Sequence, residues 1–211
     1  MKLSNILYIK IFIIVFYIVG LLGFLLPLTF EFFRHLTPWA LLMALFLLIL
    51  FHTDFNKKTI LIFTCIYLTG LIIEILGVNT GIIFGQYSYG KSLGPKIWDT
   101  PLIIGLNWLF LVYVSSSVAS KLKTNIILKI FVASLIMLIY DIVLEQVADN
   151  LDMWYWHSSS VPLTNYIAWF ILSFIFISLI KLTKIKTDNR LAFTLLLSQF
   201  FFFLGLFILL E

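Results

Sequence analysis

Three acidic residues recur at helical intervals within one apolar stretch of the chain. Asp141, Glu145 and Asp149 follow one another every fourth residue, so a helix would place them along one side. Ionisable groups in apolar segments of membrane length usually face a cavity, a partner or a substrate. Three neighbouring carboxyl groups in a low dielectric cannot all be ionised. We therefore expect one to keep a proton that it can donate, and a neighbour to accept one.

A fourth acid, Glu74, ends another apolar segment, three residues before Gly77. If the two segments are neighbours, Glu74 joins the same pocket. The alternative is structural, with the acids capping helix ends and bonding to Asn, Tyr or Trp side chains. Acid–base chemistry of this kind requires no cofactor. The histidines are scattered and Cys65 is alone, a pattern that does not indicate a metal site.

Aromatic residues follow the acids in two connecting segments. Interfacial aromatic residues commonly form a belt at the membrane surface. Beside acids, the same rings could instead line an apolar pocket, where their faces would stabilise a carbocation. The residues concerned are Tyr87, Tyr89 and Trp98 in the first segment, and Trp154, Tyr155 and Trp156 in the second.

The composition requires lipid as the solvent for most of the chain. Of 211 residues, 62% are hydrophobic and only 11% are charged, against roughly 25% charged in soluble domains. The mean hydropathy is +1.11. A net charge of +4 does not indicate nucleic-acid binding, because the basic residues flank apolar runs. We predict an all-α, polytopic transmembrane helical bundle that forms a single domain over residues 1–211.

Seven apolar runs approach the roughly 20 residues that a helix needs to cross a membrane. They are residues 6–28, 38–52, 58–76, 101–119, 125–148, 163–181 and 191–210. The second is short, although it could begin earlier, near Phe32. Pro38 suits the first turn of that helix, where a missing N–H has no consequence.

The distribution of basic residues predicts the orientation. With seven spans, the N-terminus and the connections near 53–57, 120–124 and 182–190 share one side. That side holds 11 Lys and Arg residues, against 3 on the other. Cytoplasmic loops are the basic ones, so we predict a cytoplasmic N-terminus and a bacterial inner (cytoplasmic) membrane location.

Two blocks of sequence resemble the carotenoid biosynthesis membrane-protein family, which includes the carotenoid 1,2-hydratases and the bisanhydrobacterioruberin hydratase. The first block is Glu74–Gly81 with Phe84–Tyr89, and the second is Asp141–Glu145 with Trp154–Trp156, Val161–Tyr166 and Trp169. The chain departs from the family pattern at Gln146, where a proline is expected, and at Ser158–Ser160, in place of a turn with glycine and tyrosine.

The resemblance implies addition of water to the terminal double bond of an acyclic carotenoid or another long isoprenoid, within membrane lipid. Protonation of such an alkene gives a tertiary cation, which water captures. Asp141 or Glu145 would donate the proton, and Glu74 or the remaining acid would guide the water. The expected substrate-binding residues are Asn79, Thr80, Tyr87, Tyr89, Trp98, Asp149, Trp154, Trp156 and Asn165.

Three other functions stay open at this point. A carotenoid end-group cyclase shares the protonation step but captures the cation with an internal alkene. A Mg²⁺-dependent prenyltransferase could use the acids of Asp149–Asp152, although it would need a second acidic motif. A non-catalytic carrier of lipid or carotenoid would need neither a proton donor nor an acidic motif for Mg²⁺.

Overall fold

Seven long helices and four short strands make up the described part of the chain. The structure is a computed structural model that describes residues 3–210. Its helices are α1 (Leu3–Leu25), α2 (Pro27–Leu50), α3 (Lys57–Thr80), α4 (Ile103–Ser120), α5 (Ile126–Glu145), α6 (Leu163–Leu182) and α7 (Ala192–Leu209). All seven are long and apolar enough to cross a membrane. The predicted all-α polytopic bundle is confirmed, and the chain is an integral membrane protein.

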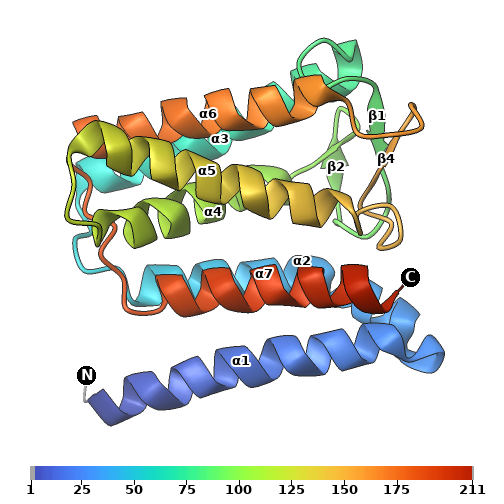
Figure 1. Ribbon diagram of the computed structural model, residues 1–211, viewed down its shortest axis with the longest axis horizontal. Helices are drawn as coiled ribbons and strands as arrows, with labels where there is room; N and C mark the ends of the chain where they lie inside the picture. Colours follow the sequence, from blue (N-terminus) through green and yellow to red (C-terminus); the bar gives the residue numbers. More distant parts are fainter. Residues whose placement is uncertain (1–2, 211) are drawn as a thin grey trace.

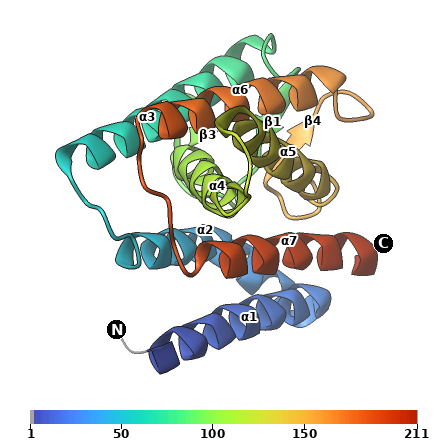
Figure 2. The same cartoon turned by 60° about the vertical axis from the view of Figure 1, so that its left-hand side comes forward.

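Helix α4 is the centre of the bundle. It packs against α2, α3, α5, α6 and α7 (Figure 2), and 78% of its span is buried, against 33% or less in the others. Helix α1 lies at the edge, against α7 and α2 (Figure 1). Side chains on α4 are therefore mostly enclosed by the neighbouring helices.

The second span begins eleven residues earlier than the predicted start at Pro38. Pro27 occupies the first turn of α2, where its missing N–H is tolerated, and it also ends α1 at Leu25 instead of residue 28. The Thr29 hydroxyl donates to the Gly23 carbonyl (2.7 Å) at this break. Pro38 lies inside α2. A proline inside a membrane helix is compatible with the fold where neighbouring groups satisfy the freed backbone.

Four short strands cover the end of the bundle that is opposite the N-terminus (Figure 1). β1 (Tyr87–Tyr89) pairs antiparallel with β4 (Trp154–Trp156), with Tyr87 opposite Trp156 and Tyr89 opposite Trp154. β2 (Lys96–Ile97) pairs with β3 (Thr100–Pro101). No strand was predicted in these connecting segments, because each strand is only two or three residues long.

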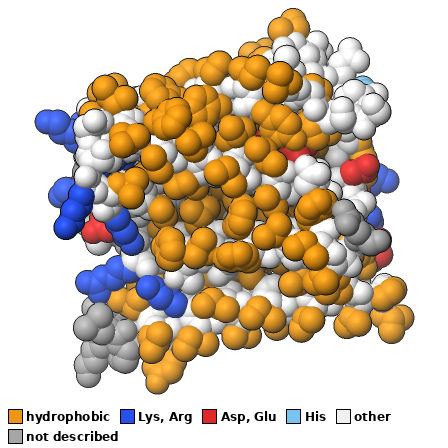
Figure 3. Space-filling view, in the orientation of Figure 1, with side chains coloured by type: hydrophobic (Ala, Val, Ile, Leu, Met, Phe, Trp, Pro, Cys, Tyr) orange, Lys and Arg blue, Asp and Glu red, His pale blue; other side chains and the backbone are white. Residues whose placement is uncertain are grey.

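The surface agrees with a membrane location. Hydrophobic side chains cover the sides of the bundle, and Lys and Arg gather mostly at the end where the N-terminus lies (Figure 3). We refer to this as the lysine-rich end, and to the opposite end, which has the strands, as the strand end.

Candidate active site

Glu74 lies in the last two turns of α3 and is buried. Its Oε2 accepts hydrogen bonds from the hydroxyls of Tyr87 (2.7 Å) and Tyr89 (2.8 Å). Its Oε1 accepts one from Trp108 Nε1 (2.9 Å) on α4. The alternation of side chains along β1 places both tyrosines on the same, buried face, so one short strand supplies two donors to one carboxyl group.

Burial, followed by the neighbouring Glu74 carboxyl, raises the pKa of Tyr87 and of Tyr89 well above the usual range. Both hydroxyls therefore stay protonated at any physiological pH. They act on Glu74 as hydrogen-bond donors, an arrangement that suits a carboxylate as the acceptor.

Glu145 is the last residue of α5. Its Oε2 accepts hydrogen bonds from the indole nitrogens of Trp154 (3.0 Å) and Trp156 (2.7 Å) on β4. Its Oε1 accepts one from Asn165 Nδ2 (3.2 Å) in the first turn of α6. The two tryptophans are two residues apart on a strand, so both indoles reach the same side.

Asp141 lies one helical turn before Glu145 and is completely buried. Its Oδ2 accepts a hydrogen bond from Asn165 Nδ2 (3.1 Å), so this one amide bridges both acids. Its Oδ1 is buried without a partner among the described residues. An unpaired buried oxygen is costly for a carboxylate, whereas a pair of neighbouring carboxyl groups can share one proton.

A small cavity of about 20 Å³ separates Glu74 from Glu145. A buried water needs at least about 10–15 Å³ and two to four polar partners, so the cavity has room for one water. The aromatic part of its wall consists of Phe84, Tyr87, Tyr89, Trp154, Trp156 and Trp169. Trp169 also stacks on Trp108, with ring centroids 4.2 Å apart, and this fixes the floor of the site.

The acids do not have the placement of structural caps. Glu145 ends α5, and Glu74 lies near the end of α3, where the helix dipole disfavours negative charge. The donors come from other elements of the fold, at least 9 residues away in sequence. The structural alternative also predicted hydrogen bonds from Asn, Tyr and Trp side chains. These bonds are present, but they surround the cavity between Glu74 and Glu145.

Eight of the twelve predicted site residues lie in this cluster. They are Glu74, Asp141, Glu145, Tyr87, Tyr89, Trp154, Trp156 and Asn165. Asp149 is not on the same helix because α5 ends at Glu145, three residues before the predicted end at 148, and the chain then turns. Asp149 is exposed and does not line the cavity between Glu74 and Glu145, but it lines a surface pocket that Glu145, Trp154 and Trp156 also border.

The other three predicted residues lie at or beyond the end of α3 and do not line the cavity. Asn79 donates to the carbonyls of Ile75 (2.8 Å) and Trp98 (3.1 Å), and Thr80 donates to that of Leu76 (2.6 Å). Trp98 is 70% exposed. Asn79 and Thr80 thus satisfy backbone carbonyls at the end of α3, and Trp98 contributes only its own backbone carbonyl.

Trp108 and Asn107 on α4 were not among the predicted site residues. Trp108 donates to Glu74, and Asn107 lines the cavity. Both lie in a long apolar run, where the sequence signal is one of packing; an asparagine in a span is the stronger hint, since polar groups in membranes are usually functional. Among residues 3–210, no group of three or more His, Cys, Asp and Glu is placed to hold a metal ion.

The fold and this site define a class: a seven-span integral membrane protein with buried carboxyl groups in an aromatic pocket near one end. A family model described as "Carotenoid biosynthesis protein" matches residues 35–211. The chain belongs to this family, which gives it a role in carotenoid biosynthesis and an isoprenoid substrate. The curated proteins and the solved structures that were compared with the chain contain no match.

Proposed function

We propose that the protein is a carotenoid end-group hydratase, which adds water to a terminal isoprenoid double bond. The observation that supports this most is the cavity for one water between Glu74 and Glu145. Hydration of an alkene needs an acid, a base and a positioned water, enclosed where bulk solvent does not compete. The carbocation intermediate also needs electron-rich surfaces nearby, and aromatic rings provide them.

In the proposed mechanism, Asp141 and Glu145 hold one proton between them. Asn165 donates to both carboxyl groups and so keeps them side by side. Glu145 lines the cavity and delivers the proton to the less substituted alkene carbon. The new C–H bond leaves a tertiary cation on the other carbon. Asp141 does not line the cavity, so we assign it the role of a positioning residue that acts through Glu145 and Asn165.

Water then attacks the cation, and Glu74 accepts the proton that the water loses. The C–O bond forms, and the product is a tertiary alcohol. Transfer of the proton from Glu74 back across the cavity to Glu145 restores the starting state. The net reaction is alkene plus water, without a cofactor or a redox step.

Expression in a lycopene-producing bacterial host tests the reaction class. We expect a product that is heavier than lycopene by one water for each end that reacts, because the cation is captured by water. In ¹⁸O-labelled water the product should contain the heavy oxygen, which excludes an oxygenase. Product mass and absorption are measured by chromatography with mass detection.

Two outcomes of that experiment would contradict the proposal. A product of unchanged mass with altered absorption indicates cyclisation, in which an internal alkene captures the cation. Unchanged lycopene indicates a carrier. The cavity for a water beside both acids favours hydration over cyclisation, since a cyclase has to keep water away from its cation.

We also propose that the lysine-rich end faces the cytoplasm of a bacterial inner membrane, so that the acid cluster lies near the outer surface. In a Cys65→Ser background, Ser159→Cys at the strand end should react with a membrane-impermeable maleimide on intact cells. Lys123→Cys at the lysine-rich end should react only after the membrane is broken. Both positions are exposed, so the reverse labelling pattern would show the opposite orientation.

A further inference from the structure

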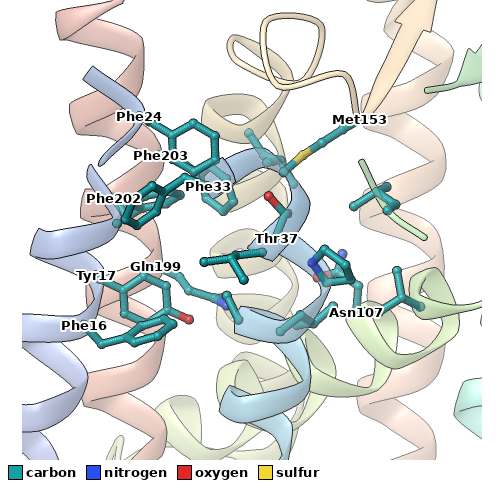
Figure 4. Close-up of a pocket in the computed structure, with 18 of the residues that line it drawn as sticks. Phe16, Tyr17, Phe24, Phe33, Thr37, Asn107, Met153, Gln199, Phe202 and Phe203 are labelled. Carbon is teal, nitrogen blue, oxygen red and sulfur yellow. The ribbon is translucent and has the colours of Figure 1, made fainter. Parts of the chain in front are cut away.

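A second and larger cavity adjoins the acid cluster. Its volume is about 140 Å³, and it lies among α1, α2, α4, α5 and α7. Figure 4 shows its aromatic side chains, with Phe16 and Phe24 from α1, Phe33 from α2 and the pair Phe202 and Phe203 from α7. We call it the apolar chamber.

The apolar chamber and the acid cavity share a wall. Ile104, Asn107 and Trp154 line both. Among the described residues, no hydrogen bond involves the Asn107 side chain, so its amide is free to bind a ligand or a water at the junction. Neither Glu74 nor Glu145 lines the chamber, so the double bond of a unit bound there reaches Glu145 only when part of this shared wall moves aside.

The size of the chamber limits what it can hold. An apolar cavity of about 150 Å³ binds a molecule the size of benzene, so 140 Å³ accommodates one terminal isoprene unit. Val19 on α1 and Leu36 on α2 also line the chamber and are 50% and 37% exposed. The chamber thus reaches the lipid-facing surface, where the remainder of a long chain can lie.

Polar atoms on the chamber wall indicate that it is a binding site and not a packing defect. The hydroxyls of Tyr17 and Thr37 are buried without a partner among the described residues, and Tyr17 is 6% exposed. Buried hydroxyls are rarely left unpaired. The Tyr17 hydroxyl lies beside the Gln199 side chain (Figure 4), whose Oε1 accepts from Tyr140, so this polar part of the wall can bind a water or the hydroxyl of an alcohol product.

Helix α1 contributes one side of the chamber, although the family match begins at residue 35. Tyr17, Gly20 and the phenylalanines of α1 therefore belong to a part of this chain that the family pattern does not include. The shape of the chamber depends on them.

We propose that the apolar chamber binds the terminal isoprene unit of an acyclic isoprenoid, that the rest of the chain leaves into lipid between α1 and α2, and that α1 determines which end groups fit. This rests on the proposed function for the identity of the reacting bond. The binding itself does not depend on hydration, so the two can be tested separately.

The test uses lycopene as the probe and the full-length protein in detergent micelles. An achiral polyene gains a circular-dichroism signal in its visible absorption band only when it is held in a chiral site. Gly20→Phe should lower the affinity for lycopene by at least about tenfold, since even one methylene in an apolar pocket changes discrimination by about 10–200-fold. Ala40→Phe narrows the same chamber from α2 and should act in the same way.

Two matched variants control for folding and for added bulk. A Cβ at Gly20 meets only the Phe202 ring, at 3.4 Å, which is an ordinary contact, so Gly20→Ala should retain lycopene. Leu22→Phe adds bulk to α1 at a lipid-facing position outside the chamber and should also retain it. β-Carotene, whose end rings exceed the chamber, should give little signal.

Undiminished lycopene binding in both Gly20→Phe and Ala40→Phe would overturn the chamber proposal, even if the protein hydrates lycopene. Loss of binding in both, with the two controls intact and no hydrated product in the host, would support the chamber and refute hydration. Equal signals from lycopene and β-carotene would show that α1 does not select the end group.

Discussion

Glu145→Gln should reduce the rate of hydration by about 10²–10⁴-fold, the usual contribution of a general acid or base. Glutamine has the same shape, and its carbonyl oxygen can still accept the bonds from Trp154 and Trp156, but it has no acidic proton to deliver. Glu74→Gln should lower the rate to a similar degree, because the attacking water would lose its base. The measurement is product formed per unit of time in membranes with matched protein levels.

Glu31→Gln provides the control for removal of a carboxylate at the same end of the bundle. Glu31 is 63% exposed in its side chain and pairs with Arg34 on the surface, where ion pairs contribute at most about 1 kcal/mol. Its activity should match that of the unmodified protein. Full activity in both Glu145→Gln and Glu74→Gln would exclude acid–base catalysis by this cluster.

Asp141→Asn separates a positioning role from a direct one. Asn165 donates to Asp141 and to Glu145 from a single nitrogen, so an amide at 141 leaves Glu145 without its proton-sharing partner. If Asp141 acts through Glu145, Asp141→Asn should shift the pH profile of hydration and leave lycopene binding unchanged. If Asp141 has a merely structural role, Asp141→Asn should lower the stability of the protein, the hydration rate and lycopene binding together.

The helices could be predicted because hydrophobic length is a strong signal in membranes. The spacing of Asp141 and Glu145 predicted that they lie on one side of a helix, and both do so on α5. Glu74 lies near them because α3 and α5 both pack against α4. Helix ends are weaker signals. Pro27 and Pro38 are both compatible with a first turn, and only the packed structure shows that the chain breaks at Leu26.

The strand pairing could not be predicted, although it builds the site. β1 and β4 are three residues long, too short for a periodic pattern, and they are more than 60 residues apart in the chain. In both runs, Tyr87–Ser88–Tyr89 and Trp154–Tyr155–Trp156, the middle residue is exposed and its two neighbours are buried or half-buried. Tertiary pairing, however, turns this alternation into two pairs of donors, one for Glu74 and one for Glu145.

Gly105→Ala should destabilise the protein and displace Glu74 from its indole donor. Gly105 on α4 lies against α3, where an added Cβ would be 2.6 Å from the Tyr67 carbonyl oxygen. Backbone cannot rotate away as a side chain does, so α3 would have to move. Overpacking of this kind costs about 1–3 kcal/mol, which exceeds the gain of up to about 1 kcal/mol from replacing glycine in a helix.

Gly205→Ala is the matched control, because its Cβ would meet only the flexible end of Leu21, at 3.0 Å, and the helix gain should then prevail. The measurements are the free energy of unfolding of each variant in mixed micelles and its hydration rate; we expect both to be lower for Gly105→Ala than for Gly205→Ala. Small residues let membrane helices approach closely, and at Gly70 a Cβ would likewise meet Trp108 at 2.9 Å. If Gly105→Ala proves as stable and as active as Gly205→Ala, the close approach of α3 to α4 is not what aligns Glu74 with Trp108, and the register of β1 must position that acid instead.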